Sequence, residues 1–273
     1  MRCKYVWLVT MSLLLFSCKK DTIMNDPAPA PKPAVLLKDI VIPNLPAPYY
    51  HFEYTATGQL AFASFASDLT RYDFVYNGDK ISEIRNNIIV NKDRLQYSYD
   101  TEGRVSFIQY MDSSGAFFAE SFFTYDGARL VKAERFHKRE TGPGTVVDRV
   151  MEMAYNAEGN LLQLTDHRPA MNGQSETTAV DRFEQYDNKI NVDAFSRLHP
   201  DFFEHLFILP GVQLQKNNPG KEIRTGDGIN YEVNYTYTYT SNNAPLRRTG
   251  DLLITNGTNA GQRFQTSSIY TYY

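Results

Sequence analysis

The chain has 273 residues and a formal net charge of −3, with 28 basic and 31 acidic residues. This balance, with no basic stripe, argues against nucleic-acid binding, because contacts to phosphates need clustered Lys and Arg. The two cysteines, Cys3 and Cys18, both lie near the N-terminus. The rest of the chain therefore has no thiol for a disulfide, a cysteine metal site or a cysteine nucleophile.

Residues 1–17 have the pattern of an export signal. Arg2 and Lys4 precede an apolar stretch, residues 5–16, that is shorter than the roughly 20 residues needed to span a bilayer. Leu15-Phe16-Ser17-Cys18 then has the form of a bacterial lipoprotein cleavage site, which would leave Cys18 as the acylated first residue. The alternative is an ordinary secretory signal with an incidental cysteine. We expect a cell-envelope protein attached to a membrane through a lipid on Cys18.

Residues 18–48 are predicted to be a tether. The segment holds seven of the thirteen prolines, and the alternation of Pro and Ala around Pro29 favours extended polyproline II. We expect the tether to hold the following domain, residues 49–273, away from the membrane. Such an anchor fits either face of the outer membrane, so the domain is expected to be surface-exposed or periplasmic.

The domain is organised around a repeated segment, most clearly Tyr99-Asp100-Thr101-Glu102-Gly103-Arg104-Val105. Asp at the first position of a type I turn accepts backbone hydrogen bonds, and Gly adopts positive φ without strain. Shorter copies contain Asn77-Gly78 and Asp126-Gly127, the preferred centres of two-residue hairpins. The spacing grows from 22 residues (54 to 76) to 31 (155 to 186), a range typical of repeat architectures. The copies begin at Tyr54, Tyr76, Tyr99, Tyr125, Tyr155 and Tyr186.

The clearest copy, with Ile108 three residues after Val105, resembles the YD repeat of Rhs-type proteins. The resemblance covers residues 54–190, and the copies vary: Thr or Asn replaces Asp in several, and Asn188 replaces Gly in the last. The chain is also similar to uncharacterised Bacteroidota lipoproteins that carry such hairpins behind a lipid anchor and are assigned to domains of unknown function. The resemblance implies a fold and a lipid-anchored location at the outer membrane, and it implies no reaction.

Residues 49–273 are predicted to form one all-β domain. Short turns at both ends of the segments make it a long antiparallel up-and-down meander, since parallel strands need long crossovers. More than ten twisted strands rarely stay flat and open, so we expect a strongly curved sheet or an incomplete barrel. Period-two alternation predicts strands near 49–55, 59–66, 71–77, 80–90, 94–100, 104–112, 116–126, 129–141, 145–156, 160–169, 174–187, 221–226, 229–241, 245–256 and 262–273.

One short helical insertion is predicted near 193–209. It consists of a capped turn followed by a helix that begins at Pro200. Because this helix is apolar on most sides, we expect it to be buried and to plug an end or the concave face of the sheet. His199, Asp201, Glu204 and His205 form a candidate metal cluster. The interpretation we favour is a polar edge on a buried helix, with Asp201 at its positive N-terminus, and no metal or cofactor is predicted.

A row of tyrosines between Tyr231 and Tyr239 is expected on one face of a strand. Exposed rows of this kind stack on sugars, but the sole Trp is Trp7, which would be lost with the signal. We therefore expect the row to fill the sheet through cross-strand contacts. The sequence has no hydrolase elbow, zinc-binding helix or phosphate-binding loop, and its 31 acidic residues single out no catalytic pair.

Three functions remain open. The favoured one is a non-enzymatic binding or adhesion module for a glycan or a protein, which suits a long tether and a large sheet. The second is a structural or assembly component of the outer membrane or periplasm, for which a free strand edge would be suited. The third is a hydrolase whose site is assembled from distant loops.

Overall fold

The computed structural model describes residues 35–171, 173–199 and 205–273. The predicted signal peptide (1–17), the lipid-attachment residue Cys18 and most of the predicted tether lie outside these residues and stay predictions. Within the described ranges, no helix reaches the length and hydrophobicity that a membrane span requires.

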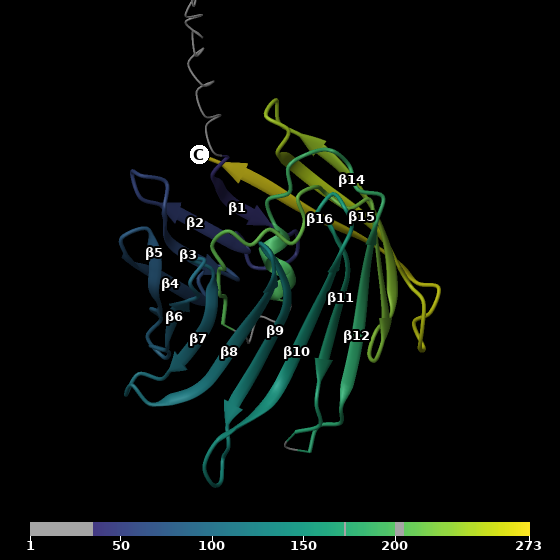
Figure 1. Ribbon diagram of the computed structural model, residues 1–273. Coiled ribbons are helices and arrows are strands. Elements are labelled where there is room, and N and C mark those ends of the chain that lie inside the picture. Colours follow the sequence, from purple (N-terminus) through teal and green to yellow (C-terminus); the bar gives the residue numbers. More distant parts are fainter. Residues whose placement is uncertain (1–34, 172, 200–204) are drawn as a thin grey trace, which may run out of the picture. The chain divides into compact units, whose positions relative to one another are not determined.

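In the described part of the chain, sixteen strands form one antiparallel sheet that closes into a barrel (Figure 1). Each strand pairs with its neighbours in sequence, so the predicted all-β up-and-down meander is confirmed. The strands are β1 (Leu37–Val41), β2 (Tyr50–Tyr54), β3 (Leu60–Phe65), β4 (Thr70–Asn77), β5 (Lys80–Asn86), β6 (Arg94–Tyr99), β7 (Val105–Met111), β8 (Phe117–Asp126), β9 (Arg129–Lys138), β10 (Thr145–Tyr155), β11 (Leu161–Arg168), β12 (Thr177–Glu184), β13 (Lys221–Gly226), β14 (Tyr231–Tyr239), β15 (Pro245–Ile254) and β16 (Arg263–Tyr272).

The sheet closes, which corrects the expectation of a strongly curved sheet or an incomplete barrel. The closing strand is β1, which lies within the range 18–48 that the sequence analysis assigned to the tether. It pairs with β16 on one side, where Val41 lies opposite Ile269, and with β2 on the other. Joining the two edge strands satisfies backbone groups that an open sheet would leave unpaired.

The repeated segments form β-hairpins at one end of the barrel, which we call the tyrosine end. In the clearest copy, Asp100 accepts hydrogen bonds of 2.9 Å from the backbone N–H groups of Glu102 and Arg104, as the turn chemistry predicts. Positive φ explains why glycine recurs in these turns. It is found at Gly58, Gly78, Gly103, Gly127 and Gly159.

The repeated tyrosines join neighbouring hairpins in what we call the tyrosine ladder. The hydroxyl of Tyr99 donates to the carbonyl of Ile81 at 2.8 Å. The later copies bond to the preceding hairpin in the same way, and Tyr54 of the first copy bonds to Leu37 on β1. The guanidinium of Arg104 lies 4.9 Å from the centre of the Tyr125 ring, a cation–π contact between hairpins. The remaining bonds are Tyr76–Leu60, Tyr125–Val105, Tyr155–Leu130 and Tyr186–Leu161.

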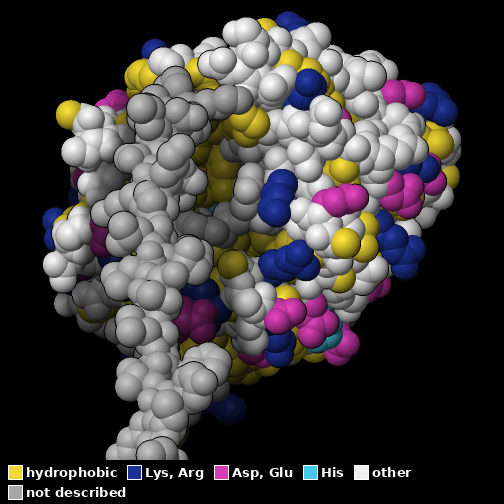
Figure 2. Space-filling model, turned by 45° about the horizontal axis from the view of Figure 1, so that its top comes forward, with side chains coloured by type: hydrophobic (Ala, Val, Ile, Leu, Met, Phe, Trp, Pro, Cys, Tyr) yellow, Lys and Arg dark blue, Asp and Glu magenta, His cyan; other side chains and the backbone are white. Residues whose placement is uncertain are grey.

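The two faces of the barrel wall differ in polarity. The outer face carries ion pairs such as Lys132 with Glu134 (2.7 Å) and Lys221 with Glu232 (3.0 Å). On the face seen in Figure 2, charged side chains of both signs are interspersed with scattered hydrophobic ones. The inner face is largely apolar, and its core includes Phe52, Phe65, Tyr72, Ile84, Leu95, Ile108, Leu130, Met153, Leu164 and Phe183.

The connection between β12 and β13 enters the barrel interior, and we call its described residues, 185–199 and 205–220, the internal segment. It contains the 3-10 helix η1 (Ala194–Leu198) and the buried residues Leu206 and Leu209, which join the core. The expectation that an insertion near 193–209 is helical and buried is therefore correct for the turn at η1 and for burial, but Asp193 makes no side-chain capping hydrogen bond. Residues 205–209 are not helical. The amide of Leu206 donates to the hydroxyl of Tyr72 on the barrel wall (3.2 Å), so it has a partner other than a helix carbonyl.

Candidate functional site

A hollow of about 570 Å³ lies inside the mouth of the barrel, at the end opposite the tyrosine end. Five of its lining residues point inward from neighbouring strands, and three belong to the turn between β13 and β14. We call it the mouth hollow. It is lined by Arg224, Asp227, Gly228, Ile229, Tyr231, Leu252, Ile254 and Phe264.

The lining of the mouth hollow is mainly apolar and partly open to solvent. Ile229 is 63% exposed and Phe264 is 50% exposed. Phe264 lies opposite Leu252 across the β15–β16 pair, so both side chains project from the same face of the sheet. Concave apolar surfaces with a few polar groups are typical of binding sites.

Tyr231 connects the mouth hollow to a buried charged network. The hydroxyls of Tyr231 and Tyr235 donate to the two oxygens of Glu222, at 3.0 and 2.8 Å, and Arg197 lies 2.9 Å from the same carboxylate. Burial alone would raise the pKa of Glu222, but the charge of Arg197 and these hydrogen bonds hold that pKa below its usual range. Glu222 is therefore ionised, and both of its carboxylate oxygens have hydrogen-bond or ion-pair partners.

A second ion pair holds the internal segment to the wall of the barrel. Arg248 on β15 lies 2.9 Å from Asp193, just before η1, and the hydroxyl of Tyr270 on β16 donates to the same carboxylate at 2.7 Å. Together with the Arg197–Glu222 pair, this contact fixes η1 against the wall from β13 to β16. Buried pairs of this kind cost much to break, because the remaining charge has no partner.

The polar wall of the mouth hollow is neutralised by its own ion pair. Arg224 donates two hydrogen bonds of 2.7 Å to Asp181 on the neighbouring strand β12. This two-pronged geometry holds the guanidinium against the wall. The hollow therefore offers an incoming ligand apolar contacts. Its polar side holds the paired Arg224, the hydroxyl of Tyr231 and the carboxylate of Asp227, which accepts a hydrogen bond from the backbone N–H of Thr178.

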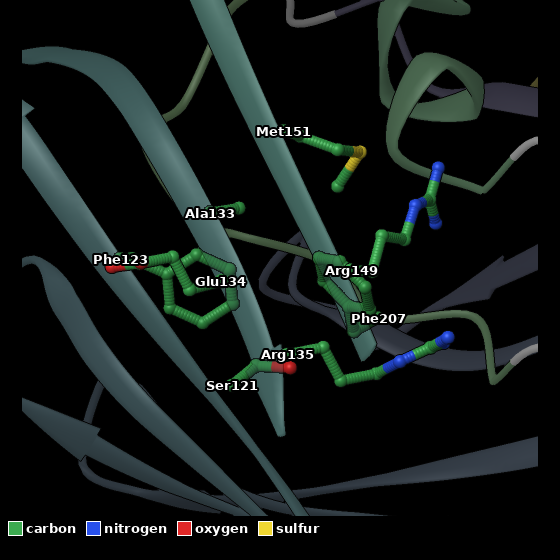
Figure 3. A pocket seen from close by; sticks show the side chains of 8 residues that line it. All are labelled: Ser121, Phe123, Ala133, Glu134, Arg135, Arg149, Met151 and Phe207. Carbon is green, nitrogen blue, oxygen red and sulfur yellow. The ribbon is translucent and has the colours of Figure 1, made fainter. Parts of the chain in front are cut away.

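A small cavity on the other side of the interior lies between β8, β9, β10 and the internal segment (Figure 3). Figure 3 shows the side chains of Arg135 and Arg149 extending away from Phe123 and Ala133. Arg149 pairs with Asp166 at 2.8 Å and Arg135 pairs with Asp148 at 2.8 Å. The cavity measures about 10 Å³, no more than one water needs, so this region is packed and offers no ligand site.

The histidines of the candidate metal cluster are bonded to the barrel wall. His199 is buried, and its Nδ1 lies 3.2 Å from the hydroxyl of Tyr50. His205 lies 3.3 Å from the hydroxyl of Tyr72 through Nδ1 and 3.0 Å from Asp93 through Nε2. Among the described residues, no group of three or more His, Cys, Asp or Glu is arranged to hold a metal.

The other two members of that cluster, Asp201 and Glu204, lie outside the described residues. In the described residues, His199 and His205 bond to different groups of the barrel wall, and neither lies on the buried helix that the sequence predicted.

The tyrosine row on β14 faces the interior, as the cross-strand interpretation predicts. Tyr235 donates to Glu222, and Tyr237 donates to the carbonyl of Pro219 at 3.0 Å. The hydroxyl of Tyr239 bonds to Asp187. These hydroxyls are engaged within the barrel, so the row does not form an outer platform for sugars.

Comparisons with known proteins identify the fold. A porin-like protein from Bacteroides uniformis is similar to this chain with a TM-score of 0.56 and 12% identity, over 88% of this chain and 95% of that one. A porin-like protein from Bacteroides vulgatus gives a TM-score of 0.54 and 13% identity, over 82% and 92%. This chain therefore shares a barrel fold with proteins of Bacteroides. No protein-family model matches the sequence, and no curated protein does.

Sequence reasoning did not find the mouth hollow. Its residues come from four strands and one turn, and the one local motif among them, Asp227-Gly228, indicates a turn and not a binding site. The available signal was weak: the turn between β13 and β14 carries an exposed Ile229, and β16 begins with an apolar Phe264 beside Arg263. Only the register of strands β13 to β16 brings these residues together.

Proposed function

We propose that this protein is a non-enzymatic, lipid-anchored binding protein of the cell envelope, which captures a ligand at the mouth hollow. The observation that carries this proposal is the open, mainly apolar hollow of about 570 Å³ inside the mouth of the barrel. The carboxylate in the lining, Asp227, accepts a hydrogen bond of 2.8 Å from the backbone N–H of Thr178, and Asp181 and Glu222 behind the lining are each paired with an arginine. That arrangement suits a rigid scaffold better than acid–base catalysis, which needs a carboxylate free to exchange a proton.

The polarity of the wall supports a barrel that stands in water. A barrel that spans a bilayer carries an outward apolar band about 25 Å tall, flanked by aromatic girdles. Here the outer face carries ion pairs, including Arg263 with Asp251 at 2.6 Å, among scattered apolar side chains such as Phe122 and Leu246, while the buried apolar core faces inward. The described part of the internal segment also occupies the interior, where a porin has its channel. Although its structural neighbours are porin-like, we propose that this barrel binds rather than conducts.

Attachment to the membrane then rests on Cys18 and the predicted tether. The barrel likeness to proteins of Bacteroides supports the envelope location. If the anchor is correct, Cys18→Ser moves the protein from the membrane fraction to the soluble envelope fraction. Protease treatment of intact cells, with lysed cells as the control, then distinguishes a surface-exposed barrel from a periplasmic one.

The apolar lining favours a protein ligand over a glycan. Sugar platforms use exposed aromatic faces, and the tyrosine row of β14 is turned inward and hydrogen-bonded. The mouth hollow is instead lined by Ile229, Leu252 and Phe264, which can pack against apolar side chains of a protein ligand.

Ligand binding is tested with a fluorescent reporter at the rim. The only native tryptophan is Trp7, so Ile229→Trp in the full chain places a distinctive fluorophore in the hollow. The chain is held in a lipid nanodisc and titrated with peptides, a soluble glucose oligosaccharide and octanoate. We expect a saturable emission shift with peptides and no shift with the oligosaccharide. A reporter that responds to none of the three probes would refute the proposed binding function.

A further inference from the structure

The first half of β16 has a partner strand on one side only. Arg263–Ser268 lies along β15, with which β16 pairs as far as Ile269. β1 covers only the last part of β16, from Ile269 to Tyr272. No other strand among the described residues pairs with β16. We call Arg263–Ser268 the free edge.

The sequence after β1 explains why the free edge is left uncovered. Pro43 has no backbone N–H to continue a ladder, and the next residue, Asn44, has a φ of +67°. The amide of Leu45 donates to the carbonyl of Ile42 at 3.2 Å, which closes a turn. The chain thus leaves β16 immediately after Val41 and crosses to β2.

The register identifies which backbone groups of the free edge are unpaired. At one end of β16, the amide of Tyr273 donates toward β1, to Leu36. At the other end, the carbonyl of Gln262 accepts from Ile254 of β15. Backbone groups of an antiparallel strand alternate in direction from residue to residue. Arg263, Gln265 and Ser267 therefore direct their N–H and C=O groups away from β15, toward the uncovered side.

The free edge borders the mouth hollow. Phe264, the second residue of the free edge, is part of the lining of the hollow. Residues 263–266 are all exposed to solvent. A strand added beside β16 would continue the same sheet, so every second side chain of that strand would project from the same face as Phe264 and Leu252.

We propose that the free edge and the mouth hollow together bind an extended polypeptide segment of a partner protein. The segment adds a strand beside Arg263–Ser268 and places alternate apolar side chains in the hollow. This inference rests on the proposed binding function and names the ligand class for the same site. Main-chain hydrogen bonds supply affinity in such strand addition, and pockets for alternate side chains supply selectivity.

A second copy of this chain fits the free edge less well. Two free edges related by a two-fold axis would meet along at most the six residues of Arg263–Ser268. A contact of that size falls well short of the roughly 1,200 Å² that a stable dimer buries. The strands of another barrel are also fixed in their own sheet, whereas a flexible segment can follow the edge and reach into the hollow.

The test combines the Ile229→Trp reporter with a backbone substitution at the free edge. Gln265→Pro removes an N–H that has no strand partner among the described residues, and proline is tolerated where the N–H of an edge strand faces solvent. Gln265→Thr is the matched control, because it changes the side chain and keeps the N–H. The probes are peptides of about ten residues that alternate Thr with Val or Leu, titrated into the full chain in nanodiscs.

We expect the peptides to shift the reporter, and Gln265→Pro to weaken their binding about tenfold, as the loss of one or two net hydrogen bonds implies. The dissociation constant of Gln265→Thr should stay within about threefold of the parent's, because this variant keeps the backbone N–H. Melting temperatures confirm that both variants fold. If Gln265→Pro does not fold, Ser267→Pro takes the place of that variant in the comparison, because it removes the next outward N–H.

Three outcomes would overturn the inference, and they differ from failure of the proposed function. If octanoate shifts the reporter and no peptide does, the hollow binds but strand addition is wrong. If Gln265→Pro binds peptides as tightly as Gln265→Thr, the free edge is not used. If the chain without ligand forms a dimer that Gln265→Pro dissociates, a second copy occupies the edge. Failure of every probe would reject the binding function itself.

Discussion

The two ends of this barrel are built from the same antiparallel strands, but they differ in how completely their turns and strand edges are hydrogen-bonded. At the tyrosine end, each turn is locked by a side chain of the next hairpin, as in the bond from Tyr99 to Ile81. At the mouth formed by β13 to β16, the lining is exposed at Ile229 and Phe264. Within residues 35–171, 173–199 and 205–273, no second strand pairs with β16 along Arg263–Ser268. The comparison shows that repeated turn chemistry joins neighbouring hairpins at one end of the barrel, whereas the irregular end leaves apolar side chains exposed.

The largest effect is expected where the internal segment is tied to the mouth wall. Glu222→Gln leaves the buried Arg197 without a counter-charge, so the free energy of unfolding should fall by about 3–5 kcal/mol. Urea denaturation measures this. The control is Glu232→Gln, which removes the exposed partner of Lys221 on the outer face and should cost no more than about 1 kcal/mol. Equal losses in the two variants would show that the buried pair does not anchor the segment.

The packing of the internal segment gives the next effect. Leu206 is fully buried, so Leu206→Ala should lower the free energy of unfolding by about 2–5 kcal/mol, through lost apolar burial and a residual cavity. Leu246, which is 43% exposed, supplies the control, and Leu246→Ala should change stability by about 0.5 kcal/mol or less. A stable Leu206→Ala chain would mean that the segment is not part of the core.

A smaller effect is expected from one rung of the tyrosine ladder. Tyr99→Phe removes the hydroxyl that bonds to Ile81 and should cost about 1 kcal/mol. The same measurement on Tyr125→Phe tests whether the rungs are equivalent. If neither variant is destabilised, the ladder does not contribute to closure of the barrel.

The ladder also predicts sensitivity to alkaline pH. Burial raises the pKa of Tyr54, Tyr99 and Tyr125 to about 12, above the ordinary value of 10.0. A raised pKa means that these groups stabilise the fold fully below pH 10 and lose that contribution as the pH rises toward 12. Unfolding free energies at pH 8 and pH 11 measure the loss, and it should be smaller in Tyr99→Phe. Equal free energies of unfolding at pH 8 and pH 11 would contradict this prediction.

Local chemistry made most of the strands and hairpins predictable. The turn at Asp100–Gly103 depends on residues adjacent in sequence, and the alternation of β14 placed Tyr235 and Tyr237 on the correct face. The closing strand β1 was missed because it is short, lies among prolines, and is paired with Ile269 and its neighbours at the far end of the chain. No local pattern signals such a contact.

The internal segment and the mouth hollow show where sequence reasoning reaches its limit. An apolar run near Leu206 predicts burial, but it does not say whether the backbone is bonded within a helix or to Tyr72 on the wall. The hollow depends on the register that places Phe264 opposite Leu252, and on the turn after Val41 that leaves the edge of β16 free. Both are tertiary features, and neither follows from composition or periodicity.

Hydrogen exchange resolved to single amides of β16 tests the contrast between the two ends most directly. If one edge of β16 is free, the amides of Arg263, Gln265 and Ser267 exchange rapidly, while those of Phe264 and Thr266, directed toward β15, are protected. Beyond Ile269, where β1 pairs with β16, both sets should be protected. Equal protection of neighbouring residues along Arg263–Ser268 would contradict the free edge, and with it the account of the mouth as a site for strand addition.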